Sequence, residues 1–263
     1  MEWRLESRKS MKLNKRNKKE LRIICLFLLA ITVIFLWIVQ NIGFPIETKI
    51  FQGGKIKVID VSSYNGNINW KKVKDQEINH AMLKIGSGIN GKRKGMEDSR
   101  FSGNYRNAGY AAIHRGIYYY SYAENVTDAR KEAKHCLSLM QKNGIDPTDL
   151  DLPVAYDVEE PSVFQTGKEN VTAITVAFCE EIEKAGFTPM IYSGVSALNH
   201  YFDYDKIKKY KIWVAHYTNR SRPAVRFPYQ MWQYTSKASV PGANTGRGYC
   251  DVSYYYINQK ERK

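Results

Sequence analysis

The residues best suited to chemistry are the two acids of Asp157-Val158-Glu159. They close the segment 152–159, whose apolar and aromatic residues predict a β-strand. Side chains alternate along a strand, so Asp157 and Glu159 face the same side. Two carboxylates on one face repel each other, which raises the pKa of one of them. A raised pKa suits a carboxyl group to donate a proton to a leaving oxygen, as the acid of a glycosidase must.

The Asp-x-Glu pattern alone is a weak indication, because strand-end carboxylates also bind water or cap the next helix. Two further acids strengthen a catalytic interpretation: Asp60 lies near the end of the first predicted strand and Asp251 near the start of the last. Aromatic residues lie on the other predicted strands: Tyr118, Tyr120, Tyr192, Trp213, Tyr217, Trp232 and Tyr234. Carboxylates and aromatic platforms gathered at one face are typical of enzymes that cut carbohydrate.

Other chemistries find little support along the chain. No Ser-His-Asp or Cys-His pattern is recognisable, and the five histidines lack metal-ligand spacing. Cys136 and Cys179 fall on apolar helical stripes, and no C-x-x-C pattern is present. We therefore expect buried thiols rather than a disulfide framework or a zinc site.

Strand-like segments are predicted to position these groups, and they are 57–62, 80–86, 115–122, 152–159, 188–193, 211–217, 229–235 and 250–256. Helical spacing of apolar residues lies between several of them, at 126–140 and 171–185, and shorter helices are expected over 98–110 and 196–209. No strong helix pattern follows residue 211. The alternation predicts an α/β fold, an irregular TIM-like β/α barrel with a helix-poor C-terminal part. In such a barrel the active site lies at the carboxyl ends of the strands.

An uncharged run, residues 23–39, follows the basic residues 1–22. A helix of this length spans about 25 Å, near the lower limit for crossing a bilayer. Because positive charge stays in the cytoplasm, we expect one transmembrane anchor over 23–44 with the N-terminus inside. A connector over 45–56 then leads to an extracellular domain, residues 57–263. The alternative is a cleaved signal peptide, although no small-residue cleavage site follows the run.

The chain has a formal net charge of +14, and residues 1–22 supply nine Lys/Arg against three Glu. The remaining excess favours anionic partners, and no nucleic-acid-binding motif is present. Anionic wall polymers or lipid headgroups are the partners we expect. A solvated basic surface without a partner is the alternative.

The ordered motifs of residues 57–256 resemble those of the family 25 glycoside hydrolases, the muramidases often called lysozymes. The segments that carry this resemblance are VIDVSSYNGNINW (58–70), GIYYYSYA (116–123), PVAYDVEE (153–160), PMIYSG (189–194), IWVAHY (212–217), MWQYTS (231–236), VPG (240–242) and YCDVSYY (249–255). The resemblance implies an irregular β/α barrel, in agreement with the strand and helix pattern.

The resemblance also implies roles for single residues. Glu159 matches the general acid, and Asp157 matches the partner that orients or polarises the acetamido group of the substrate. Asp60 and Asp251 match the other active-site carboxylates. Substrate-lining residues are expected to be Tyr118, Tyr192, Trp213, Tyr217 and Trp232. Members often have His-Phe where this chain has Tyr119-Tyr120, so sugar contacts there are expected to differ.

The implied reaction is hydrolysis of the β-1,4 bond from N-acetylmuramic acid to N-acetylglucosamine in peptidoglycan, without metal or cofactor. No side chain is an evident covalent nucleophile, so we expect substrate-assisted acid catalysis. The anchor would hold the enzyme in a bacterial cell membrane and favours remodelling of nearby wall. We expect a monomer. Two alternatives remain: a non-catalytic glycan-binding module, and a barrel hydrolase that acts on chitin-like polymers.

Overall fold

The computed structural model describes residues 54–90 and 93–256, and the fold below concerns those residues alone. The strands are β1 (Lys55–Val61), β2 (His80–Asn90), β3 (Arg93–Glu97), β4 (His114–Tyr120), β5 (Val154–Asp157), β6 (Pro189–Gly194), β7 (Lys211–Ala215), β8 (Met231–Ala238) and β9 (Cys250–Tyr256). The helices are α2 (Trp70–Lys74), α3 (Phe101–Tyr110), α4 (Val126–Lys142), α5 (Pro161–Phe164), α6 (Lys168–Lys184), α7 (Val195–Tyr201) and α8 (Tyr204–Ile207), with short 3-10 turns η1 (Ser63–Asn65) and η2 (Pro147–Asp149).

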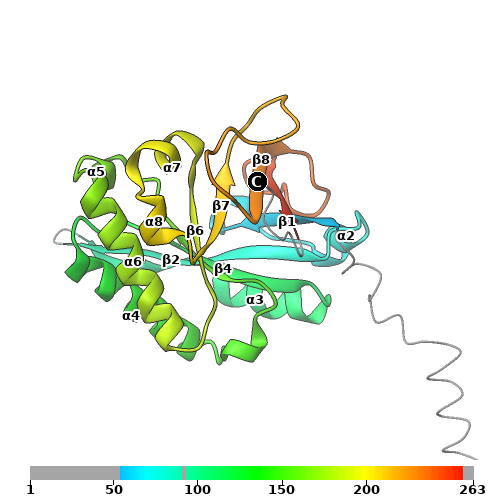
Figure 1. Cartoon of the computed structure of the whole chain (residues 1–263). Coiled ribbons are helices and arrows are strands. Elements are labelled where there is room, and N and C mark those ends of the chain that lie inside the picture. The colour runs from blue at the N-terminus through cyan, green and yellow to red at the C-terminus, as the bar shows by residue number, and fades with distance from the viewer. Residues whose placement is uncertain (1–53, 91–92, 257–263) are drawn as a thin grey trace, which may run out of the picture. The chain divides into compact units, whose positions relative to one another are not determined.

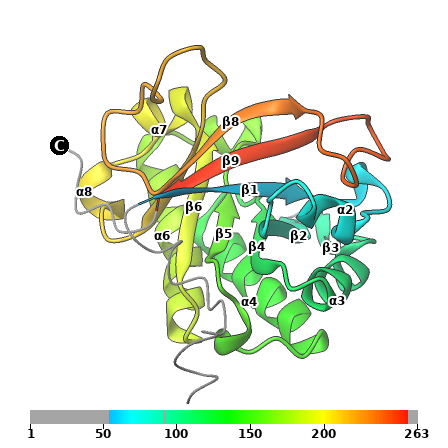
Figure 2. The ribbon, with the colours of Figure 1, turned by 90° about the vertical axis from the view of Figure 1, so that its right-hand side faces the viewer.

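The strands form one sheet in the order β1-β9-β8-β7-β6-β5-β4-β2-β3, and a β1–β2 pairing closes it. β3 extends the sheet beside β2, so the other eight strands make the barrel wall. Neighbours from β1 round to β8 are parallel, whereas β9 is antiparallel to both β8 and β1. Figure 2 shows β8, β9 and β1 side by side. The predicted TIM-like barrel is therefore confirmed.

The two long helices cover one side of this barrel, as Figure 1 shows. α4 begins after Asn125, whose side chain caps it by accepting a hydrogen bond from the backbone N–H of Asp128. α6 lies beside α4, and Arg130 forms an ion pair with Glu181 across them. In the described part of the chain no helix follows α8. The helix-poor C-terminal part is thus confirmed, and Cys136, Cys179 and Cys250 are buried free thiols.

Some elements differ from expectation. β2 continues to Asn90, and β3 pairs with it in the antiparallel direction. β3 was not predicted, because the Lys- and Gly-rich segment 91–97 has no apolar alternation. One expected helix over 196–209 is two helices, α7 and α8, and β1 begins at Lys55 rather than 57. The predicted tail 1–22, the anchor 23–44 and the connector up to residue 53 lie outside the described residues. Within the described ranges no helix is long and apolar enough to span a membrane.

Apolar side chains fill the interior of the barrel in a layer of their own, formed by Val58, Met82, Leu152, Ala155, Met190, Trp213 and Met231 with part of Tyr192. Gly116 leaves room for this layer, because a Cβ there would lie 2.5 Å from the sulfur of Met82. The interior is therefore a packed floor and not a channel, as is usual for such barrels.

A buried carboxylate outside the barrel wall ties several elements together. Glu132 of α4 accepts hydrogen bonds from the backbone N–H groups of Tyr122 (2.8 Å) and Ile89 (3.1 Å), and from the hydroxyl of Tyr156 (2.6 Å). Burial raises the pKa of Glu132, and these hydrogen bonds lower it. Burial has the larger effect, so the pKa is about 7. Glu132 thus fixes the ends of β2 and β4, which border the functional site described below.

We predict that Glu132→Ala lowers the free energy of unfolding by about 3–5 kcal/mol, because it leaves buried donors without an acceptor. Urea unfolding followed by tryptophan fluorescence measures the change. Lys134→Ala, at an exposed position of the same helix, is the matched control and should change stability by about 0.5 kcal/mol or less. Equal stability of the two variants would contradict the role given to Glu132.

Candidate active site

A second inward-facing layer lies directly above the apolar floor, at the carboxyl ends of the parallel strands. Because side chains alternate in strands, a residue two positions after an inward-facing strand residue also points inward. The residues placed in this way are Asp60, Lys84, Tyr118, Asp157, Tyr192 and Gln233. The polar site is thus a consequence of strand periodicity, and its floor excludes water from below.

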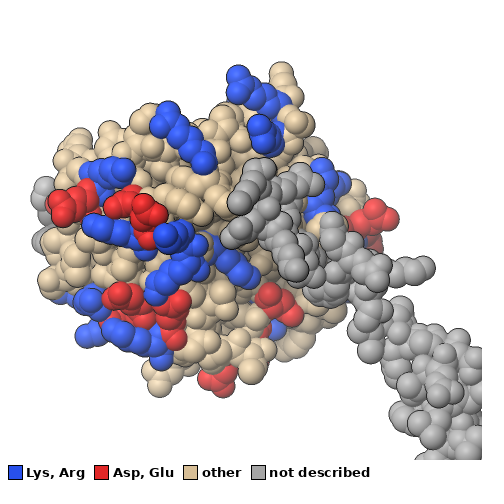
Figure 3. All heavy atoms as spheres, viewed as in Figure 1, with Lys and Arg blue, Asp and Glu red and all other residues tan. Residues whose placement is uncertain are grey.

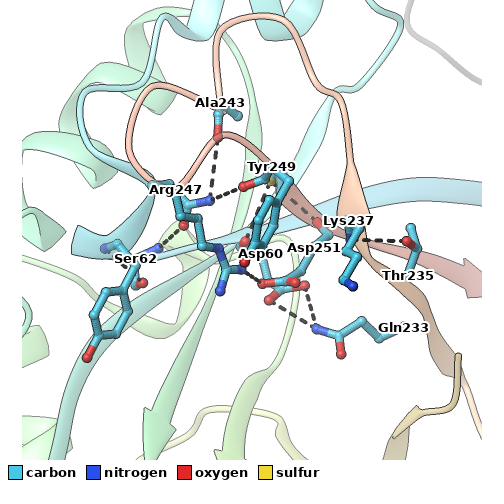
Figure 4. A network of polar contacts seen from close by, with 12 residues as sticks. Asp60, Ser62, Gln233, Thr235, Lys237, Ala243, Arg247, Tyr249 and Asp251 are labelled. Carbon is cyan, nitrogen blue, oxygen red and sulfur yellow. Dashed lines mark hydrogen bonds and ion pairs between the residues drawn. The ribbon is translucent and has the colours of Figure 1, made fainter.

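β9 delivers the next carboxylate to the same end. Its antiparallel pairing with β1 places Asp251 directly opposite Asp60. Figure 4 shows both side chains in one network with Gln233 and Arg247. The Gln233 amide nitrogen donates to both Asp60 oxygens, at 3.2 and 3.0 Å, and Arg247 forms a close ion pair with Asp251.

Gln233 is the centre of the hydrogen bonding in this site. Its amide oxygen accepts hydrogen bonds from the hydroxyls of Tyr192 (2.9 Å) and Tyr217 (2.7 Å), while its nitrogen serves Asp60. The nitrogen and the oxygen of one buried amide therefore fix an aspartate and two tyrosines. Gln233 was not predicted from the sequence. Its only indication there is a lone Gln in the apolar start of β8, where a polar side chain needs an inward partner.

Together these groups enclose a cavity of about 260 Å³ that is lined by Asp60, Ser62, Tyr64, Lys84, Tyr118, Tyr120, Asp157, Glu159, Tyr192, Trp213, Tyr217, Gln233, Ser236, Arg247 and Asp251. The structure brings all four predicted carboxylates and four of the five predicted aromatic residues to this cavity. A larger hollow of about 580 Å³ lies between α2 and α3, and none of the described residues that line it is acidic. We therefore place the chemistry in the smaller cavity.

Trp232 is the predicted site residue that the structure places elsewhere. Its indole N–H donates to the backbone oxygen of His216 at 2.8 Å, and its ring packs near Tyr234 and Tyr254. Met231 and Gln233 point into the barrel, so alternation turns Trp232 outward. The expectation that Trp232 lines the substrate is corrected accordingly.

Burial dominates the electrostatics of the four carboxylates. It raises the pKa of Glu159 and Asp157, and Lys84 opposes that rise for both. Burial likewise raises the pKa of Asp60 and Asp251, while Arg247 lowers it. Asp157 Oδ1 is buried and has no hydrogen-bond partner within the described part of the chain. The cavity can thus hold a proton on a carboxyl group and still offer an unpaired acceptor.

Lys84 is the second functional residue that the sequence analysis missed. Its position in β2, two residues after Met82, places it in the polar layer, and its ammonium lies 4.8 Å from the ring centre of Tyr120. A single Lys inside an apolar strand was the only indication in the sequence. Among the described residues no group of three His, Cys, Asp or Glu side chains is arranged to hold a metal ion.

Comparison with known proteins agrees with this geometry. Residues 59–243 match the family described as glycosyl hydrolases family 25. The chain is 34% identical over 120 residues to lysozyme M1 of Streptomyces globisporus, a match that covers 46% of this chain and 36% of that protein. The chain belongs to the glycosyl hydrolases of family 25.

Solved structures show the same fold. The modular autolysin LytC of Streptococcus pneumoniae superposes with a TM-score of 0.65 at 30% identity, covering 77% of this chain and 47% of LytC. The lysozyme of Streptomyces coelicolor gives a TM-score of 0.61 at 26% identity, covering 78% of this chain and 93% of that protein. The chain thus spans less than half of lysozyme M1 and of LytC.

We predict that Lys84→Met raises the pKa of both Glu159 and Asp157, because the ammonium that favours their charged forms is removed. Carbon-13 NMR of the labelled side-chain carboxyl groups measures these pKa values without any substrate. Lys134→Met, exposed on α4, is the control and should leave both values unchanged. Unchanged titration in Lys84→Met would show that Lys84 does not act on the acid pair.

Proposed function

We propose that this protein is a muramidase that hydrolyses the β-1,4 bond between N-acetylmuramic acid and N-acetylglucosamine in peptidoglycan. The observation that carries the proposal is the convergence of Asp60, Asp157, Glu159 and Asp251 in one cavity of a family 25 barrel. Exposed aromatic rings at the cavity wall, Tyr64 and Tyr217, suit stacking on sugars. LytC has been solved in complex with a synthetic peptidoglycan ligand, which supports the same class of ligand here.

Catalysis is proposed to be substrate-assisted. Glu159 keeps its proton because burial raises its pKa, and it donates that proton to the glycosidic oxygen as the bond breaks. The oxygen of the 2-acetamido group attacks the anomeric carbon from the opposite face. The unpaired Asp157 Oδ1 suits the acetamido N–H, which it would orient and polarise. Trapping of a covalent glycosyl-aspartate on the protein would overturn this mechanism.

The test compares full-length wild-type protein with Glu159→Gln on purified peptidoglycan. We expect muramic-acid reducing ends from the wild type and a loss of about 10²–10⁴-fold in rate in the variant, which is the usual contribution of general acid catalysis. Reducing ends are identified by borohydride labelling and mass spectrometry. Glu169→Gln, exposed at the start of α6, is the control and should retain activity.

Other outcomes separate the alternatives. Binding of peptidoglycan by the wild type without release of ends would favour a glycan-binding module. Release from chitin oligomers alone would favour a chitin-type hydrolase. Either result would contradict muramidase activity.

The location proposed for this activity is the outer face of a bacterial membrane. The apolar run 23–44 and the basic residues 1–22 support a single-pass anchor with a cytoplasmic N-terminus and domain 57–263 outside. A tether limits the reach of the site and so favours local wall remodelling by a monomer. Basic residues support contact with anionic wall polymers, although on the face seen in Figure 3 basic and acidic side chains are interspersed.

We predict that the full-length chain sediments with the membrane fraction and resists extraction with high salt or carbonate. Replacing three apolar residues of the run, Leu28, Ile34 and Leu36, by Asp should release it, because a charge at the bilayer centre costs several kcal/mol. Mass spectrometry of the membrane-bound protein reports its N-terminus. A mature form that starts after residue 40 would contradict the anchor and support a cleaved signal peptide.

A further inference from the structure

We propose that Arg247 is a specificity-determining residue that binds a carboxylate carried by the glycan substrate. This inference rests on the proposed function, because it names the substrate group that the same cavity would recognise. Muramic acid carries a lactyl group, whose carboxylate is free where the stem peptide has been removed. Where the peptide is present, the peptide carries carboxylates of its own. Both sources offer the same chemistry, a carboxylate close to the sugar ring.

The position of Arg247 in the cavity carries the inference. One guanidinium nitrogen pairs with Asp251 Oδ2, and the group lies 5.0 Å from the ring centre of Tyr249. Within the described part of the chain, the other guanidinium N–H groups have no hydrogen-bond partner. The side chain is 35% exposed and lines the cavity, so these donors remain available at its mouth.

The loop that carries Arg247 is held firmly against the end of β1. The backbone N–H groups of Gly246 and Arg247 donate to the oxygens of Asn65 (2.9 Å) and Tyr64 (3.2 Å). The approach requires glycine, because a Cβ at Gly246 would lie 2.0 Å from the Tyr64 oxygen. Thr245 adds a hydroxyl bond of 2.7 Å to the oxygen of Asn67. A preorganised donor of this kind loses little entropy on binding.

The charge distribution explains why the ligand should be an anion. A neutral sugar offers hydroxyl and amide groups, which the carboxylates of the cavity can already bind. A guanidinium instead matches a carboxylate, which it can bind through two parallel hydrogen bonds. Lys84 lies on the side of Asp157 and Glu159, whereas Arg247 lies on the side of Asp251. Arg247 is thus the cation placed to contact a substituent that projects from the sugar.

The competing interpretation is that Arg247 only pairs with Asp251. Binding measurements on the full-length Glu159→Gln protein in detergent separate the two, since this variant leaves the glycan uncut. Calorimetry would use four probes in two matched pairs. The first pair is glycan without stem peptides, before and after its lactyl carboxylates are converted to methylamides. The second pair is peptide-bearing glycan, before and after the same conversion of the peptide carboxylates.

In at least one pair, we expect the glycan with free carboxylates to bind about tenfold more tightly than its methylamide form, a factor that equals about 1.4 kcal/mol. A preference in the first pair assigns the lactyl carboxylate, and a preference in the second assigns the stem peptide. Adding Arg247→Met should abolish the preference without weakening the methylamide member, while Arg247→Lys should retain part of it. Equal binding within both pairs would overturn the proposal. So would a loss in Arg247→Met that is equal for both members, as a pure Asp251 partner would give.

The binding measurements do not depend on cleavage of the glycan. Each pair of probes is compared on the Glu159→Gln protein alone, so the test still works if an Arg247 variant fails to fold. Cleavage of peptide-bearing glycan by the wild type is measured in parallel. Absence of muramic-acid ends would contradict the muramidase proposal alone. Equal binding within the pairs, together with normal cleavage, would contradict only the role of Arg247.

Discussion

The antiparallel return of β9 between β8 and β1 is the constraint on which this site depends. Parallel strands bring only their carboxyl ends to the active face, whereas β9 brings its first residues there. Its register with β1 sets Asp251 opposite Asp60, while β5 and its continuation supply Asp157 and Glu159. A parallel last strand would start at the opposite end of the barrel and leave Asp251 far from the other acids.

The packed apolar floor under the site contributes to the burial that raises the pKa of these carboxyl groups. Met82, Ala155 and Trp213 keep water from reaching the acids from below, so burial raises their pKa. An unpaired buried charge costs several kcal/mol, and paired or hydrogen-bonded charges cost much less. Gln233 bonds Asp60, and Arg247 pairs with Asp251. Specific partners thus offset the burial of Asp60 and Asp251, whereas burial raises the pKa of Asp157 and Glu159 and so favours their neutral forms.

The sequence predicted the barrel and its carboxylates because both depend on local patterns: apolar runs, helical spacing and acids at strand ends. The residues that the sequence did not predict correctly depend on how the strands pair in the folded protein. Strands of a parallel barrel are covered on both faces, so their sequences do not show which face points inward. The run Met231-Trp232-Gln233-Tyr234 allows either phase, and only the pairing with β7 and β9 turns Gln233 in and Trp232 out. The role of Lys84 depends on Asp157 and Glu159, which lie more than 70 residues away in the chain. The role of Arg247 depends on the loop that places it near Asp60 of β1 as well as Asp251.

The two cations of the cavity, Lys84 and Arg247, lie beside different carboxylates. In the half of Asp157 and Glu159, Lys84 lowers both pKa values, and Asp157 is affected further by the charge of Glu159. The proposed mechanism requires a protonated Glu159 beside an Asp157 that accepts a hydrogen bond. In the other half, Arg247 neutralises Asp251, and Gln233 holds Asp60 with neutral donors. The proposed proton transfer therefore lies in the half that contains Lys84, and the proposed recognition of a carboxylate lies in the half that contains the planar guanidinium of Arg247.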